Sequence, residues 1–157
     1  MERLILPGAL RGTVSAPLSK SFAHRALVCA ALCSEPTHLC FLPDSQDLAA
    51  TMDGLAALGA AFSKQENGLT VQPIEKTPVA PRLDCRESGS TLRFLLPVAA
   101  ALTDRAHFTG EGRLPQRPIA PLLDALADHG VSFSGSVLPL RVSRWERGGD
   151  FLLPGHI

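Results

Sequence analysis

The chain has 157 residues and a formal net charge of zero, with 15 lysines and arginines against 15 aspartates and glutamates. Zero net charge argues against nucleic acid or an anionic membrane as the main partner, because both favour a surplus of cations. Hydrophobic residues make up 45% and charged residues 19%, which indicates a folded globular protein. The longest uncharged apolar run, residues 94–102, is about half a membrane span, and no signal-peptide pattern opens the chain. We therefore expect a cytoplasmic protein.

The first predicted unit covers residues 13–75 and has the order βαβαββ. A strand near 12–16 leads to a helix from Ser19 to about position 33, with Ser19 as its N-cap. We expect four residues on the buried face of this helix: Phe22, Ala26, Cys29 and Cys33.

The remainder of this unit has clear boundary signals. The pattern predicts a short strand at 37–42 and a second helix that Asp44 or Ser45 caps and Gly59 ends. A hairpin follows, with its turn at Asn67-Gly68.

A proline-rich linker, residues 75–81, precedes a second predicted unit over residues 82–145. Its predicted elements are a strand at 83–85, a helix at 90–102, a strand at 106–109, a helix from Pro118 to before Gly130, and a hairpin at 131–143. Residues 150–157 look like the opening strand of a third unit.

The two units resemble each other in sequence. "GLAALGAAFS" (54–63) aligns with "ALADHGVSFS" (125–134) at an offset of 71, so that Phe62 matches Phe133. An offset of 68 places Arg25 over Arg93. The predicted fold class is therefore α/β (α+β), built of about two βαβαββ units and the start of a third.

No pattern in the sequence predicts a metal site or a cofactor. The four cysteines lack C-x-x-C spacing, and the five histidines lack ligand spacing. A calcium loop beginning at Asp44 would need glutamate at position 55, where Leu55 stands. We expect the cysteines to be buried free thiols and the histidines to be structural.

Cations and hydroxyls gather at the start of the predicted helices. Ser19, Lys20 and Ser21 open the first helix, and Arg25 lies one turn after Ser21. A helix N-terminus with hydroxyl and cationic side chains suits an anion. A capping serine with solvated charges would look the same in sequence, and that alternative stays open.

Two further segments repeat the pattern. In "RESGSTLRF" (86–94), Gly89 allows close backbone approach and Arg93 follows one turn later. In "GEGRLPQRPI" (110–119), glycines and prolines shape a stiff loop that displays Arg113 and Arg117. Ordinary helix capping is again the alternative. If the units pack alike, these segments converge on one cleft for a substrate with more than one anionic group.

Four segments, "PLSKSFAHRAL", "PDSQDLAATMDGLAALGA", "ESGSTLRFLLPVAAAL" and "FTGEGRLPQRPIAPLLDAL", resemble the EPSP synthase family in sequence and order. These enzymes are the 3-phosphoshikimate 1-carboxyvinyltransferases of the shikimate pathway. The resemblance implies a fold of two domains, each with three βαβαββ units, and an active site between them. It implies that residues 1–12 pair into a second, C-terminal domain, and that this chain is an N-terminal portion with little activity alone.

The resemblance also implies roles for particular residues. Lys20, Ser21 and Arg25 would hold shikimate 3-phosphate, while Lys20, Gly89 and Arg117 would contact phosphoenolpyruvate. Arg93 and Arg113 would lie close to the same cleft, and Lys20 would be catalytic. Glu87 departs from the asparagine that is commoner in the family.

The implied reaction transfers the enolpyruvyl group to the 5-hydroxyl of shikimate 3-phosphate and needs no metal or cofactor. Gly89 would also leave room for the inhibitor glyphosate.

Three alternatives remain at this point. A UDP-N-acetylglucosamine enolpyruvyl transferase would have Lys-Asn in place of Lys20-Ser21 and a reactive cysteine within residues 111–116, where this chain has none. A non-catalytic module would bind shikimate 3-phosphate only. An RNA-end enzyme of similar architecture fits poorly with the neutral charge.

Overall fold

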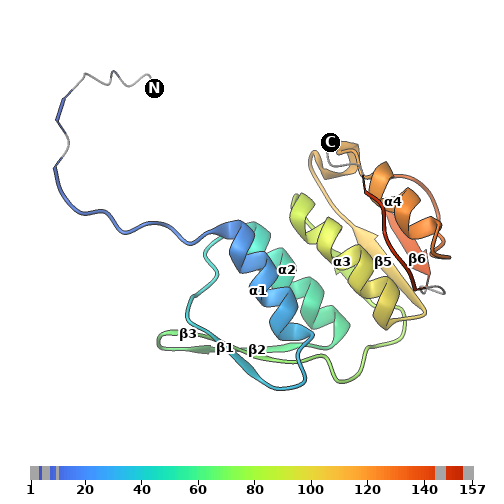
Figure 1. Cartoon of the computed structure of the whole chain (residues 1–157), viewed down its shortest axis with the longest axis horizontal. Helices are drawn as coiled ribbons and strands as arrows, with labels where there is room; N and C mark the ends of the chain where they lie inside the picture. The colour runs from blue at the N-terminus through green and yellow to red at the C-terminus, as the bar shows by residue number, and fades with distance from the viewer. Residues whose placement is uncertain (1–3, 5–7, 10, 144–147, 154–157) are drawn as a thin grey trace.

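The computed structural model describes residues 4, 8, 9, 11–143 and 148–153. Its helices are α1 (Lys20–Ala31), α2 (Gln46–Leu58), α3 (Gly89–Leu102) and α4 (Ala120–Ala127), with a 3-10 turn at Leu114–Gln116. Its strands are β1 (Thr37–Leu39), β2 (Ala61–Gln65), β3 (Gly68–Gln72), β4 (Arg82–Asp84), β5 (Arg105–Thr109) and β6 (Leu140–Ser143). Helices α1, α2 and α3 lie next to one another; the first sheet packs on α1 and α2, and the second packs on α2 and α3 (Figure 1).

The first sheet has the order β1-β3-β2 and is antiparallel throughout. Its hairpin turns at Glu66-Asn67, one position earlier than expected, because Gly68 already pairs with Gln65 as the first residue of β3. Gly68 lies so close to β1 that a Cβ there would collide with the Leu39 carbonyl. Glycine is therefore needed at this position for strand packing.

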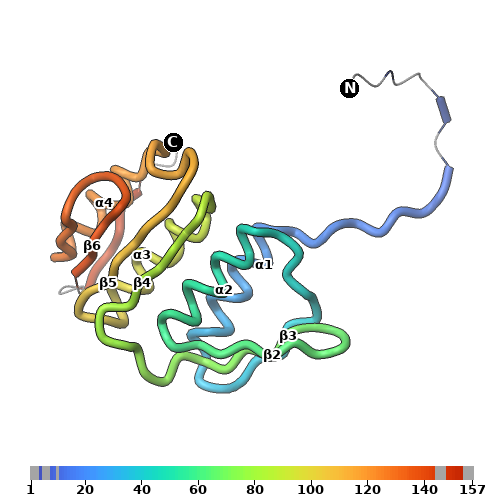
Figure 2. Tube along the Cα trace, turned by 180° about the vertical axis from the view of Figure 1, so that it is seen from behind, coloured from blue at the N-terminus to red at the C-terminus, as the bar shows by residue number. Residues whose placement is uncertain are grey.

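The second sheet has the order β4-β5-β6, with β4 parallel and β6 antiparallel to β5 (Figure 2). The hairpin expected at 131–143 is reduced to β6 and an isolated bridge between Phe133 and Val142. In the first sheet Phe62 pairs with Val71. At the offset of 71 these residues correspond to Phe133 and Val142, which form the bridge in the second sheet. The sequence repeat thus corresponds to the same local pairing, while the number and boundaries of the units stay predictions.

Helix boundaries follow the capping signals closely. Ser19 Oγ accepts a hydrogen bond from the amide of Phe22 at 3.4 Å, and Ser45 Oγ accepts one from Leu48 at 3.3 Å. Gly59 ends α2 in the left-handed conformation with φ of 116°. In the second unit, α4 begins at Ala120 rather than at Pro118, because the 3-10 turn and its flanking residues intervene.

The predicted buried face of α1 is wrong. Phe22, Cys29 and Cys33 are exposed, and the buried residues are Ala23, His24, Leu27, Ala30 and Ala31. The stripe that packs against α2 and α3 is displaced by about one residue, which is roughly 100° around the helix. Cys40 is exposed as well, so only Cys85 fits the expectation of buried thiols.

Three expected strands are not seen among the described residues. Residues 11–16 are exposed and form no strand; they lead away from the body as an extended segment (Figure 1). The strand expected within residues 1–12 falls mostly outside the described residues. Residues 151–153 form no strand, and 154–157 lie outside the described part. Phe151 instead stacks on His129, with ring centroids 3.8 Å apart.

One apolar core joins the helices to both sheets. Fully buried leucines from α1, α2 and α3 pack on strand residues such as Leu69 and Phe108. Helices α2 and α3 approach closely because position 54 is glycine: a Cβ on Gly54 would collide with the side chain of Leu95. No helix in the described part of the chain is long and apolar enough to span a membrane.

Candidate functional site

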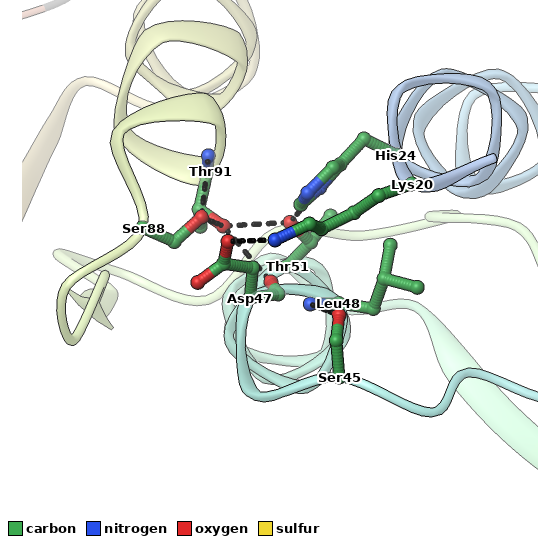
Figure 3. A network of polar contacts seen from close by, with 8 residues as sticks. All are labelled: Lys20, His24, Ser45, Asp47, Leu48, Thr51, Ser88 and Thr91. Atoms are coloured by element: carbon green, nitrogen blue, oxygen red, sulfur yellow. Dashed lines mark hydrogen bonds and ion pairs between the residues drawn. The ribbon is translucent and has the colours of Figure 1, made fainter. Parts of the chain in front are cut away.

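The starts of three helices meet at a network of polar contacts (Figure 3). Lys20, from the first turn of α1, forms an ion pair with Asp47 of α2, with Nζ 2.9 Å from Oδ2. The two side chains are 54% and 36% exposed, so this pair contributes at most about 1 kcal/mol. Lys20 is therefore held near the start of α2 but can exchange Asp47 for another anion.

Beneath this pair lies a buried chain of hydrogen bonds. His24 Nδ1 lies 2.8 Å from Thr51 Oγ1, and Thr51 Oγ1 lies 2.7 Å from Thr91 Oγ1. Thr91 Oγ1 also contacts Ser88 Oγ at 2.7 Å and the carbonyl of Asp47 at 3.2 Å. Ser88 caps α3 by accepting the Thr91 amide at 3.2 Å. The network therefore ties α1, α2 and α3 together beside the N-terminus of α3.

Counting hydrogens assigns the tautomer of His24. The single hydroxyl hydrogen of Thr91 goes to Ser88 or to the Asp47 carbonyl, so Thr91 accepts from Thr51. Thr51 has then used its own hydrogen and must accept from His24 Nδ1–H. The remaining ring nitrogen, Nε2, is a buried acceptor that has no hydrogen-bond partner among the described residues.

His24 is neutral at pH 7 for a physical reason. Burial lowers its pKa below the usual 6.5, while the nearby Asp47 carboxylate opposes this shift. The positive charges of Lys20 and Arg25 lower the pKa further. Because the His24 ring is neutral, the positive charge of the site comes from the lysine and arginine side chains.

Arg25 is held between α1 and α3. Its guanidinium donates to the carbonyl of Ser21 at 2.8 Å, and its Cζ lies 5.2 Å from the ring centre of Phe94. Stacking on an aromatic face orients a guanidinium without neutralising it. Ser21 is itself exposed at the first turn of α1.

A second group of cations surrounds Gly89, the first residue of α3. A Cβ on Gly89 would lie 2.7 Å from an Arg93 guanidinium nitrogen and 2.9 Å from one of Arg117. Arg93 also donates to the carbonyls of Gly89 and Pro118, at 3.3 and 3.0 Å. Glycine here allows two guanidiniums to approach the helix N-terminus, an arrangement that favours an anion.

Arg113 and Arg117 come from the loop that follows β5. Together with Gln116 and Pro118 they line a cavity of about 380 Å³. This loop packs on the loop before α3, because the Glu111 amide donates to the Arg86 carbonyl at 2.8 Å. Both loops therefore hold their arginines at one end of the second sheet.

Glu87 stands where the family more commonly has asparagine, and its carboxylate lies against Gly112. Gly112 has φ of 57°, and a Cβ there would collide with the Glu87 carboxylate. The side chain at position 87 therefore lies against the loop that carries the arginines.

Arg86 is a residue that sequence reasoning missed. It has φ of 49°, and its side chain bonds Gln46 Oε1 at 2.9 Å and forms an ion pair with Asp53. It therefore links the loop before α3 to one face of α2. The sequence shows Arg86 at the start of "RESGS", but no pattern in the sequence predicts that its side chain reaches Gln46 and Asp53 on α2.

The predicted site residues thus fall into two groups that share the start of α3. Lys20, Ser21 and Arg25 lie on its α1 side. Arg93 and Arg117 lie beside Gly89, and Arg113 lines a cavity together with Arg117. Ser88 connects them, because it belongs to the buried network and directly precedes Gly89. Among the described residues, no group of three histidine, cysteine or acidic side chains could hold a metal ion.

Solved structures with the same arrangement define the class of fold. An EPSP synthase from Acinetobacter baumannii superposes with a TM-score of 0.72 at 20% identity, over 85% of this chain and 32% of that chain. An enolpyruvyl transferase from Streptomyces tendae gives 0.50 at 18% identity, over 78% and 30% of the two chains. The predicted α/β class is confirmed, and the fold is that of the enolpyruvyl transferases.

Sequence comparison specifies the family. Residues 6–154 match the family EPSP synthase (3-phosphoshikimate 1-carboxyvinyltransferase). Enzymes of that name from Clostridium perfringens and Clostridium kluyveri are 35% and 36% identical over 98% of this chain. The chain belongs to the EPSP synthase family, and it spans 37% of the length of these curated relatives.

Proposed function

We propose that this chain provides one wall of an active site that transfers the enolpyruvyl group of phosphoenolpyruvate to the 5-hydroxyl of shikimate 3-phosphate. The reaction belongs to aromatic amino acid biosynthesis in the cytoplasm. The relatives are much longer than this chain, so we further propose that a C-terminal domain provides the opposite wall. On this proposal the 157-residue chain binds substrate but has little or no turnover alone.

The two groups of cations correspond to two anionic substrates. Lys20, Ser21 and Arg25 would bind shikimate 3-phosphate on the α1 side of α3. Gly89 and Arg117 would bind phosphoenolpyruvate, with Arg93 and Arg113 beside them. The observation that carries the proposal is that two guanidiniums crowd around Gly89 at the start of α3, while Lys20 is paired at the start of α2.

The proposed reaction needs a site that holds two anionic substrates in the correct orientation and stabilises their charges. The substrate hydroxyl adds to C2 of phosphoenolpyruvate, C3 gains a proton, and the tetrahedral intermediate then loses phosphate. Two anionic substrates repel each other unless cations lie between them. Lys20, in the first group, would be the catalytic cation, because its weak pair with Asp47 can be exchanged for phosphate.

Calorimetry on the chain tests this assignment. We expect Lys20→Met to weaken shikimate 3-phosphate binding about 10- to 100-fold, since a charged hydrogen bond contributes about 1.5–3 kcal/mol. Lys64→Met is the matched control, because Lys64 is an exposed lysine on β2. Equal affinities of the two variants would contradict the role of Lys20.

Two further results separate the alternatives. If shikimate 3-phosphate binds but phosphoenolpyruvate does not bind in its presence, the chain is a one-ligand module and the roles of Gly89 and Arg117 are wrong. If the chain alone converts both substrates, the need for a second domain is refuted.

A further inference from the structure

The outer face of the second sheet carries a row of basic side chains unrelated to the site at α3. Strand alternation places Leu83, Ala106, Phe108, Leu140 and Val142 in the core. Polar residues occupy the other face. In the strand register Arg82 lies opposite His107, and His107 lies opposite Arg141. One row across β4, β5 and β6 is therefore arginine, histidine, arginine, and these three strands run side by side in Figure 2.

Neither arginine of this row is neutralised. Within the part of the chain that the structure describes, Arg82 and Arg141 form no ion pair with a carboxylate. Arg105, two residues before His107 on β5, adds a third guanidinium to the same face. The two arginines of the row therefore offer positive charge with which a bound anion can pair.

The row lines a cavity of about 690 Å³, within the size range of small-molecule sites. Besides the basic side chains, its lining includes Asp84, Thr109, Ser134 and Pro139. Asp84 is the one carboxylate in this lining, and its Oδ1 already accepts the Arg86 amide at 2.9 Å. Ser134 Oγ accepts the Arg141 amide at 2.9 Å, which leaves its hydroxyl hydrogen free to donate.

The first sheet shows that the fold does not require these charges. There His38 and Thr70 lie opposite each other, as His107 and Arg141 do in the second sheet, and Ser63 lies on the other side of Thr70. At the offset of 71, Ser63 corresponds to Ser134 and Thr70 to Arg141. In that sheet His38 Nδ1 lies 3.3 Å from Thr70 Oγ1, so these two side chains bond each other. Of the two sheets in the described part of the chain, the second carries this row of two arginines and a histidine and the first does not.

We propose that this cavity binds a small polyanion through a diphosphate group, either free or carried by a nucleotide. Two guanidiniums on either side of an imidazole can each bind a phosphate with paired hydrogen bonds. Ser134 and Thr109 supply further donors to the phosphate oxygens. The site is separate from the cations around Gly89 and does not depend on the function proposed for them.

Proton NMR of the histidine ring resonances tests the proposal directly. Inorganic pyrophosphate titrated into the chain at pH 7 should shift the His107 ring signals and the amides of Arg82 and Thr109. His38, in the first sheet, is the internal control and should not move. A parallel titration with ADP identifies the source: tighter binding of ADP, with shifts in residues 134–139, indicates a nucleotide, and equal or weaker binding indicates a free diphosphate.

The matched variant is Arg141→Thr, which copies the residue of the first sheet. It should weaken pyrophosphate binding at least 10-fold, whereas Arg141→Lys should lose less and Lys64→Thr should change nothing. Shifts that shikimate 3-phosphate induces at Ser21 should persist in Arg141→Thr, so failure here is distinguishable from failure of the proposed function. The proposal is overturned if His107 and His38 respond alike, or if a folded Arg141→Thr, checked by its thermal melt, keeps full affinity.

Discussion

Replacing Thr51 by valine removes one hydroxyl from the buried network while keeping the side-chain shape. Thr51 is fully buried, and its oxygen lies 2.8 Å from His24 Nδ1 and 2.7 Å from Thr91 Oγ1. The variant leaves His24 Nδ1–H without an acceptor. Because Nε2 already has no partner in the part of the chain that the structure describes, the whole ring would then be buried there without a hydrogen bond.

The expected loss follows from the atoms left unpaired. A buried donor without an acceptor costs about 1–3 kcal/mol. Thr91 loses one donor but keeps Ser88 and the Asp47 carbonyl, so its own contribution is small. We therefore expect Thr51→Val to lower the free energy of unfolding by about 2 kcal/mol, which is roughly 4–8 °C in Tm for a chain of this size.

Urea unfolding followed by far-UV circular dichroism measures this change. Thr51→Ser is the control, because it keeps the hydroxyl and loses only a methyl, at about 1 kcal/mol. Nitrogen-15 NMR of His24 should show the hydrogen on Nδ1 in the unmodified chain. The reasoning is refuted if the valine variant is as stable as the serine variant, or if the hydrogen is on Nε2.

Three further predictions concern single residues. Gly89→Ala should weaken phosphoenolpyruvate binding by calorimetry but leave the urea midpoint nearly unchanged, because the new Cβ displaces only the flexible ends of two arginines; a large loss of stability would contradict this. Burial raises the pKa of the Cys85 thiol to about 12, so a thiol reagent should modify the three exposed cysteines quickly and Cys85 only after unfolding. The lowered pKa of His24 means that the unfolded chain binds a proton first as pH falls below 6.5. Stability should therefore decrease from pH 7.5 to 5.5 more in the unmodified chain than in His24→Gln; equal decreases would show that His24 does not titrate in this way.

The parts of the fold that the sequence predicted well depend on local contacts. Ser19, Ser45 and Gly59 act within one turn of their own helix ends, so their roles follow from the residues nearby. The same holds for the clustering of Arg113 and Arg117 on a loop stiffened by proline.

The parts that it missed depend on distant partners. Helix α1 has apolar side chains on two adjacent faces, and only packing against α2 and α3 decides which is buried. Thr51 and Thr91 are 40 residues apart, and each looks like an ordinary threonine in an apolar helix. The second unit begins with strand β4, and the sequence predicts an equivalent strand at 12–16. In the described chain nothing pairs with those residues, so no strand forms there.

Gly54 shows how the core and the candidate site depend on each other. Its missing side chain brings α2 against Leu95 of α3, which lies one helical turn beyond Thr91. This approach makes the 2.7 Å contact between Thr51 and Thr91 possible, and that contact holds the N-terminus of α3 beside the helix that carries Asp47 and its partner Lys20. The spacing between the two groups of cations is therefore set in the apolar core. A substitution that separates α2 from α3 would disturb the site without touching any residue that contacts an anion.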